Sequence, residues 1–141
     1  MIGKVIGLDL GEKTLGIAIS DSLGIIAQGI ETFRFEVAKY DLALERALYF
    51  IDKEMIKEVA LGLPLHMSGD ESDHSRLARQ FKTMLEDKRP NLKVVLIDVR
   101  WTTKQANRVL LQADLSRNKR KKVIDKMAAV VILETYLQMR G

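Results

Sequence analysis

The sequence predicts an α/β domain with a mixed five-stranded β-sheet, its first strand central and helices on both faces. Three strand-like segments follow one another with short connections, which is typical of an antiparallel meander. The later strands are separated by helices, so we expect them to lie parallel to their neighbours. The first segment is apolar on successive residues, which indicates a strand buried on both faces. No glycine- or serine-rich boundary divides the 141 residues, so we expect one domain over residues 1–141.

Five segments have the apolar, β-branched composition of strands. They cover residues 5–8, 15–19, 25–32, 59–63 and 94–98. The first two flank a short polar break that contains Gly11, which predicts a hairpin. Pro64 ends the fourth strand because proline cannot donate to a strand ladder.

Four further segments carry apolar residues at helical spacing. They cover residues 41–55, 72–87 (with Ser75 as an alternative start), 102–113 and 122–139. Asp41 is the expected N-cap of the first helix. Thr102 and Gln105 have the spacing of a capping box at the start of the third.

The composition excludes several kinds of site. Hydrophobic residues make up 47% and charged residues 30%, as in ordinary soluble domains. There is no cysteine, so disulfides and thiolate chemistry are excluded, and two histidines argue against a multi-histidine zinc site. A bound metal would be a hard cation held by carboxylates, such as Mg²⁺ or Mn²⁺. No stretch has membrane-spanning length or a signal-peptide pattern, so we expect a cytoplasmic protein without a membrane partner.

Three acidic residues are candidates for chemistry. Asp9 and Asp98 each follow an apolar strand, and ligands of mixed sheets bind at the carboxyl ends of parallel strands. A carboxylate there is costly to bury unless a metal, a donor or a basic partner meets it. Asp125 lies early in the last helix, where Ala128 and Ala129 would let the helix approach the sheet. The alternatives are that Asp9 caps a turn and that Asp125 complements the helix dipole.

A basic segment precedes Asp125. It contains Arg117, Lys119, Arg120, Lys121 and Lys122, within a chain of net charge +4. Such a cluster beside a helix indicates contact with phosphates. A solvated loop before the helix explains it equally well.

Four motifs resemble one family in order along the chain. They lie at residues 7–18 (Gly-Leu-Asp-Leu-Gly-Glu-Lys-Thr-Leu-Gly-Ile-Ala), 62–65 (Gly-Leu-Pro-Leu), 98–103 (Asp-Val-Arg-Trp-Thr-Thr) and 117–133. The sequence is similar in these motifs to the YqgF, or RuvX, family of RNase H-like nucleases. The resemblance implies an RNase H-like fold, a nuclease of pre-16S ribosomal RNA and a relation to Holliday-junction resolvases.

The resemblance also implies roles for individual residues. Asp9 and Asp125 would be the metal carboxylates, and acidic side chains in such folds hold divalent ions that activate water at a phosphate. Contacts to nucleic acid are implied for Lys13, Arg100, Thr102, Thr103, Arg117, Lys119, Arg120, Lys121 and Lys122.

One position departs from the family pattern. Val99 stands where the family has a glutamate, so a metal ligand is missing. Asp98 is adjacent and would act as the third catalytic carboxylate only if the strand has ended or bulged there, because successive strand residues point to opposite faces. We therefore expect weaker metal binding than a full site would give.

Four functions stay open from the sequence. The first is a metal-dependent endonuclease acting on pre-16S rRNA, and the second a catalytically weakened RNA-binding or ribosome-assembly module. The third is a Holliday-junction resolvase, which would need a dimer to act on branched DNA. The fourth, an actin-like ATPase, would need a second domain or a dimer around the nucleotide. We expect a monomer or a weak homodimer.

Overall fold

The computed structural model describes residues 3–100 and 117–140, with the side chains of 117–126 excepted. Helices and strands alternate after an initial run of three strands, as predicted. The elements are β1 (Val5–Leu10), β2 (Thr14–Ser20), β3 (Ala27–Arg34), α1 (Tyr40–Lys53), β4 (Glu58–Leu63), α2 (Asp73–Lys88), β5 (Lys93–Asp98) and α4 (Arg117–Arg140).

The five strands form one mixed sheet in the order β3-β2-β1-β4-β5. β1 pairs antiparallel with β2 and parallel with β4, and β4 pairs parallel with β5. β1 is therefore the central strand, with Val5 to Leu8 buried. The predicted fold class, a mixed sheet with a central first strand, is confirmed.

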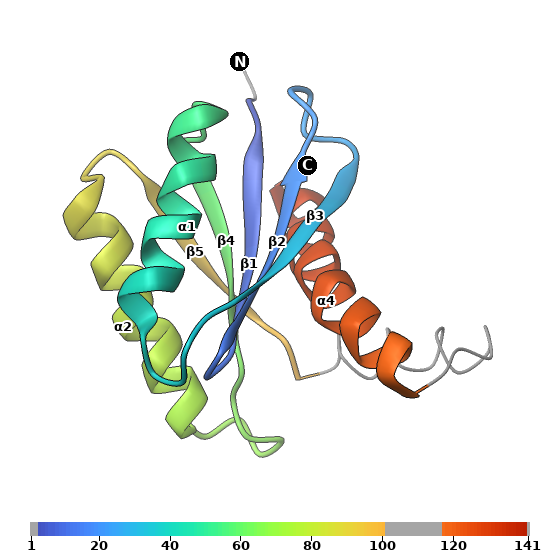
Figure 1. Cartoon of the computed structure of the whole chain (residues 1–141). Helices are drawn as coiled ribbons and strands as arrows, with labels where there is room; N and C mark the ends of the chain where they lie inside the picture. Colours follow the sequence, from blue (N-terminus) through green and yellow to red (C-terminus); the bar gives the residue numbers. More distant parts are fainter. Residues whose placement is uncertain (1–2, 101–116, 141) are drawn as a thin grey trace.

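Helices cover both faces of the sheet. α1 and α2 lie on one face and α4 crosses the other (Figure 1). The side of the sheet facing α1 and α2 holds the larger apolar cluster, which includes Leu8, Leu61 and Phe81. The α4 side holds a second cluster around Ala129 and Leu133. This alternation assigns each strand residue to one face.

The third strand lies two residues later than predicted, at Ala27–Arg34 instead of 25–32. Ile25 and Ile26 are apolar but exposed, at 70% and 65%. Their backbone N–H groups donate to Oδ1 of Asp21, at 2.7 and 3.2 Å. The Asp21 carboxylate thus holds these isoleucines in the turn before β3, which strand propensity does not reveal.

Two predicted helix starts are wrong. α1 begins at Tyr40, with Lys39 as its N-cap, and Asp41 lies inside the first turn instead of capping it. Tyr40 packs edge-on against Phe35, which fixes the earlier start. α4 begins at Arg117, not near 122, so the basic segment is helical. Lysine and arginine are good helix formers, so a basic run need not be a loop.

α2 begins at Asp73, one residue after the earlier of its two predicted starts, and Ser72 is its N-cap. The Ser72 hydroxyl accepts from the Ser75 N–H at 3.0 Å, and the Ser72 N–H donates to Oγ of Ser75 at 2.7 Å. These reciprocal bonds form a capping box. The helix predicted at 102–113 lies outside the described residues. Within the described part of the chain, no helix combines the length and apolar character needed to cross a membrane.

Candidate nucleic-acid active site

The carboxyl ends of three parallel strands gather at one edge of the sheet. β1, β4 and β5 all end there, and the N-terminal end of α4 lies toward the same end of the molecule (Figure 1). Ligands of open α/β sheets bind at this edge, because the strand ends leave room for side chains and loops.

Asp9 lies near the end of β1, on the face that α4 covers. Its neighbours Leu8 and Leu10 are buried in the cluster of the opposite face, so alternation directs Asp9 toward α4. Its partner on β2 is Gly16, which brings no side chain. Asp9 is half-buried, so part of it stays accessible at the sheet edge.

α4 approaches β1 through small residues. A Cβ placed on Gly7 would lie 2.7 Å from the carbonyl oxygen of Ala129 and 2.8 Å from Cβ of Leu133. Ala129 is fully buried. The helix backbone thus rests on the central strand, and only glycine at residue 7 leaves room for it.

The register of this contact relates Asp9 to Asp125. β1 and α4 run in opposite directions (Figure 1). Asp9 follows Gly7 by two strand residues, roughly 7 Å along β1. Asp125 precedes Ala129 by one turn, roughly 6 Å along α4. Both steps lead toward the carboxyl edge, so the backbone carries the two acidic positions to the same end of the β1–α4 contact.

Asp98, by contrast, is not brought to the face of Asp9. It ends β5, and Val94 and Leu96 before it belong to the α1–α2 side, while Val95, Ile97 and Val99 pack on the α4 side. The Asp98 carboxylate is bonded to Arg100, with Nε at 2.9 Å and Nη2 at 2.8 Å. These hydrogen bonds lower the pKa of Asp98 and raise that of Arg100.

Val99, where the family resemblance implies a glutamate, lies on the same sheet face as Asp9. Its Cγ1 would be 3.2 Å from a Cβ on Gly62, which also meets Ile132 of α4. A glutamate at residue 99 would therefore lie on the α4 side of the sheet, which is also the side of Asp9. The described residues contain no group of three or more histidine, aspartate or glutamate side chains able to hold a metal.

The structure describes some of the predicted nucleic-acid contact residues fully, others by their backbone alone, and two not at all. Lys13 is exposed in the turn between β1 and β2, at the carboxyl end of β1. The residues Arg117, Lys119, Arg120, Lys121 and Lys122 form the first turns of α4, and their side chains are not described. Thr102 and Thr103 lie outside the described residues.

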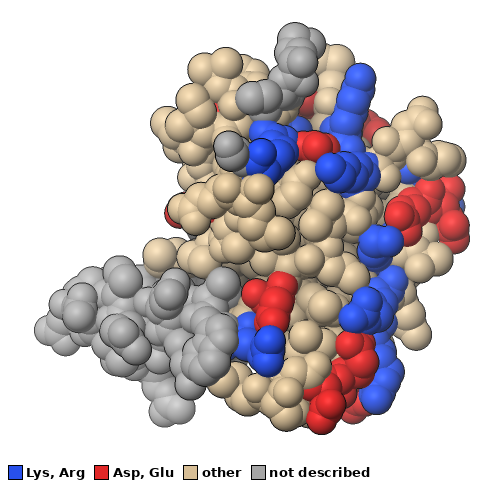
Figure 2. Space-filling view, turned by 180° about the vertical axis from the view of Figure 1, so that it is seen from behind, with Lys and Arg blue, Asp and Glu red and all other residues tan. Residues whose placement is uncertain are grey.

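Elsewhere, basic side chains have acidic neighbours. Figure 2 shows blue and red side chains lying next to one another on the side seen from behind. Arg140 pairs with Glu58, which is also 3.9 Å from Lys93. Pairing of this kind reduces the attraction of these cations for phosphates.

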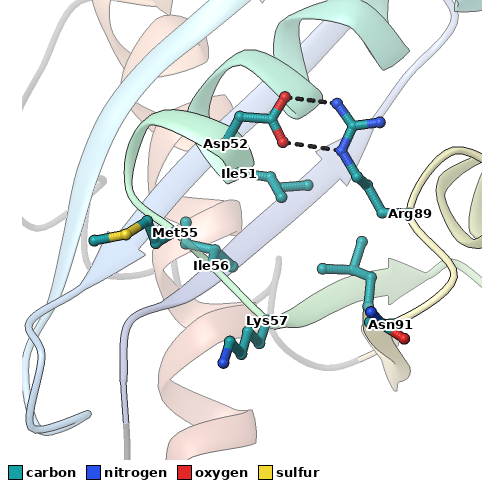
Figure 3. A pocket seen from close by; sticks show the side chains of 8 residues that line it. Ile51, Asp52, Met55, Ile56, Lys57, Arg89 and Asn91 are labelled. Carbon is teal, nitrogen blue, oxygen red and sulfur yellow. Dashed lines mark hydrogen bonds and ion pairs between the residues drawn. The ribbon is translucent and has the colours of Figure 1, made fainter.

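A pocket of about 620 Å³ lies away from this edge. It is formed where α1 ends and β4 begins, and Met55 and Ile56 are among the residues that line it (Figure 3). Leu92 lines it as well. A bidentate pair joins Asp52 to Arg89 beside it. Because β4 begins here and ends at the Asp9 edge, the pocket is not part of the candidate site.

Comparison with known proteins assigns the family. A family model described as "RuvX: Holliday junction resolvase" matches residues 3–139. The chain belongs to the RuvX family.

Two curated members of the RuvX family illustrate the relationship. A Bacillus subtilis protein is 47% identical over 134 residues, which are 95% of this chain and 96% of the relative. A Staphylococcus saprophyticus protein is 45% identical over 134 residues, 95% of this chain and 94% of the relative. Both are named "Putative pre-16S rRNA nuclease".

Solved structures share the fold at low sequence identity. Thermus thermophilus RuvC in complex with a Holliday-junction substrate has a TM-score of 0.61 and 17% identity, over 99% of this chain and 97% of that one. The fowlpox virus Holliday junction resolvase has a TM-score of 0.58 and 17% identity, over 96% and 99%. The RuvX chain therefore has the RNase H-like fold of these resolvases.

The structure also reveals features of this RuvX chain that sequence reasoning missed. The ion pair between Asp98 and Arg100 was not expected, although the i, i+2 spacing of an acid and an arginine at a strand end is visible in the sequence. The contact of Gly7 with Ala129 was not predicted either, because the small residues of α4 indicate a close approach but not which strand residue they meet. The first feature gives Asp98 its partner, and the second sets how closely α4 lies on β1.

Proposed function

We propose that this chain is a metal-dependent endonuclease that cuts structured RNA, with pre-16S rRNA as its substrate. The observation that supports the proposal is the close β1–α4 contact at Gly7 and Ala129, from which the backbone leads to Asp9 on one element and to Asp125 on the other. The names of the curated relatives support the RNA substrate.

Asp9 and Asp125 would hold a Mg²⁺ or Mn²⁺ ion. When bound between carboxylates, such an ion activates water and stabilises the leaving oxygen of a phosphodiester. Two carboxylates suit Mg²⁺, which commonly keeps several waters and shares phosphate oxygens of the substrate. The half-buried position of Asp9 supports this donor set, because a partly accessible carboxylate near a strand end can be reached by a hydrated cation.

Positive charge would position the nucleic acid beside these carboxylates. Lys13 projects from the turn that follows Asp9, and the basic segment forms the first two turns of α4 before Asp125. Phosphate contacts from lysine and arginine give affinity without sequence readout. We expect binding that weakens steeply as salt rises.

Val99 favours a second candidate, an RNA-binding or ribosome-assembly module with weak or no cleavage. Its apolar side chain packs toward Gly62 and Ile132 where a third carboxylate would otherwise stand. Asp98 is engaged by Arg100 on the other face, so it does not replace that ligand. Fewer ligands and less negative charge weaken the affinity for a hard cation.

The decisive experiment compares cleavage by the parent chain with cleavage by Asp9→Asn. Purified protein is incubated with a precursor rRNA fragment, or with a four-way DNA junction, in Mg²⁺ or Mn²⁺. We expect Asp9→Asn to slow cleavage at least about a hundredfold, as loss of a metal ligand does. Asp41→Asn, an exposed aspartate of α1 on the other face, is the matched control.

Each outcome selects one function. Cleavage of RNA alone supports the rRNA nuclease, and cleavage of the junction alone supports a resolvase. Salt-dependent binding without a metal-dependent product supports the assembly module. Equal cleavage by Asp9→Asn and the parent would show that the proposed chemistry is wrong.

A further inference from the structure

We infer that Asp98 and Arg100 form a clamp that positions the loop of residues 66–70, which follows β4, as a rigid rim beside the candidate site. The inference reassigns Arg100 from a phosphate contact to a positioning residue. The expected effect of the clamp on nucleic-acid binding rests on the proposed function, whereas its effect on the order of the loop does not.

The first half of the clamp joins two residues at the end of β5. Oδ1 of Asp98 accepts from the backbone N–H of Arg100 at 3.0 Å and from its Nε at 3.2 Å. Oδ2 accepts from Nε at 2.9 Å and from Nη2 at 2.8 Å. The carboxylate thus fixes both the backbone and the guanidinium of Arg100, and charge-assisted bonds of this kind are strong and directional.

The second half of the clamp joins Arg100 to the loop. Its Nη1 lies 3.4 Å from the carbonyl oxygen of Met67, and a Cβ on Gly69 would be 3.3 Å from the same nitrogen. Gly69 has φ +96°, a conformation that favours glycine. The guanidinium therefore packs on the loop backbone where Gly69 leaves space for it.

Among residues 3–100 and 117–140, the tip of the loop has few other anchors. The N–H of His66 donates to the carbonyl of Asp70 at 2.9 Å, and that of Gly69 to the carbonyl of His66 at 2.8 Å. These bonds close the turn but do not tie it to the sheet. His66, Met67 and Ser68 are exposed, and within the described part of the chain Arg100 donates a hydrogen bond from the end of β5 to this tip.

The loop lies beside the candidate site because β4 and β5 end together. Leu63 pairs with Asp98 in the last register of these strands, and Gly62 just before it faces Val99 and α4. Holding the 66–70 loop against β5 fixes one wall of the carboxyl edge. A fixed wall lowers the ordering cost of binding a nucleic-acid strand there.

The same geometry argues against Arg100 as a phosphate ligand. Nε and Nη2 are directed at Asp98 and Nη1 at Met67, so the planar fork that would grip a phosphate is occupied. The Asp98 charge also offsets that of the guanidinium. A phosphate would have to compete with an ion pair already formed.

The test compares Asp98→Ala, Arg100→Gln and the double variant with the parent. Amide hydrogen exchange at Gly69 and Asp70 reports the loop, and the Kd of a structured RNA fragment, measured over a salt series, reports binding. Arg76→Gln is the matched control, because Arg76 forms an exposed pair with Asp73 at 3.0 Å near the same loop. Thermal midpoints confirm that every variant is folded.

We expect both single variants to speed exchange of these amides at least about threefold, the double variant to add nothing further, and Arg76→Gln to match the parent. Kd should rise in both single variants with an unchanged salt slope. Unchanged exchange in both would overturn the clamp. So would a salt slope lowered by about one in Arg100→Gln alone, because that is the signature of a lost phosphate contact. If the parent binds no RNA, the exchange data still decide whether the clamp exists.

Discussion

Gly7 of β1 lies directly under Ala129 of α4, so close that a Cβ on the glycine would stand 2.7 Å from the alanine carbonyl oxygen. Neither group can move aside easily, because one belongs to the central strand and the other to a helix backbone. The first strand and the last helix of the chain are therefore held at a fixed separation.

Gly7→Ala should destabilise the fold by about 1–3 kcal/mol, the usual cost of overpacking a core. Urea unfolding followed by circular dichroism measures the change. Gly11→Ala is the control, since its Cβ would meet the Thr14 hydroxyl at 3.1 Å, a side-chain atom that can give way. Equal stability of Gly7→Ala and the parent would show that α4 is not seated on β1.

Val99→Glu should strengthen Mn²⁺ binding about tenfold, because it adds a carboxylate on the face that carries Asp9. Isothermal titration with Mn²⁺ measures the affinity directly, whether or not the protein cleaves. Val99→Gln controls for size and for the packing lost against Ile132. If Val99→Glu and Val99→Gln bind Mn²⁺ equally, residue 99 does not face the metal site.

The stability of the fold should decline in acid through Glu71. Bidentate bonds from Arg79, at 2.8 and 2.9 Å, lower the pKa of Glu71 from 4.5 to about 2, and the Ser75 hydroxyl contributes. A lowered folded-state pKa stabilises the protein above the unfolded value, and this contribution is lost as pH falls from 4.5 toward 2. In Glu71→Gln, the midpoint of urea unfolding should fall less between pH 5 and pH 3 than it does in the parent.

The control for this pH effect is Glu45→Gln, at an exposed glutamate of α1. It should follow the parent over the same range. A Glu71→Gln profile as steep as that of the parent would assign the acid sensitivity to other carboxylates.

Met55→Gly should stabilise the protein by about 0.5–1 kcal/mol. Met55 has φ +52° just past the end of α1, where the N–H of Ile56 bonds the carbonyl of Ile51, and its side chain is 82% exposed. A residue other than glycine in the left-handed conformation costs about 1–2 kcal/mol, and Met55→Gly removes this cost. Part of the gain is lost because glycine has more conformational freedom in the unfolded state. Thermal unfolding measures it, with Met55→Ala as a control that should change little.

The sequence was sufficient for the fold because its signals were local and consistent. Apolar runs, helical spacing and Ser72 predicted the strands and the α2 start to within one or two residues. The start of α1 could not be predicted, because the ring contact of Tyr40 with Phe35 outweighs the capping preference of Asp41. The displacement of β3 depended on the Asp21 side chain, which no propensity of Ile25 or Ile26 would show.

The site was predictable only in part. Strand-end position predicted Asp9 and motif order predicted Asp125, and the roles of both remain predictions. Whether Asp98 could act as a third carboxylate could not be predicted from the sequence. The answer depends on which face of β5 it occupies and on which residue it pairs with. The structure gives both: the α1–α2 face and Arg100.

The seating of α4 on β1 has a consequence for the timing of synthesis. Within this sequence β1 comes first and α4 last, so Asp9 is synthesised well before Asp125. Under the proposed function, a nascent chain that has the sheet but not yet α4 would hold one of the two metal carboxylates, and cleavage would begin only after α4 is added.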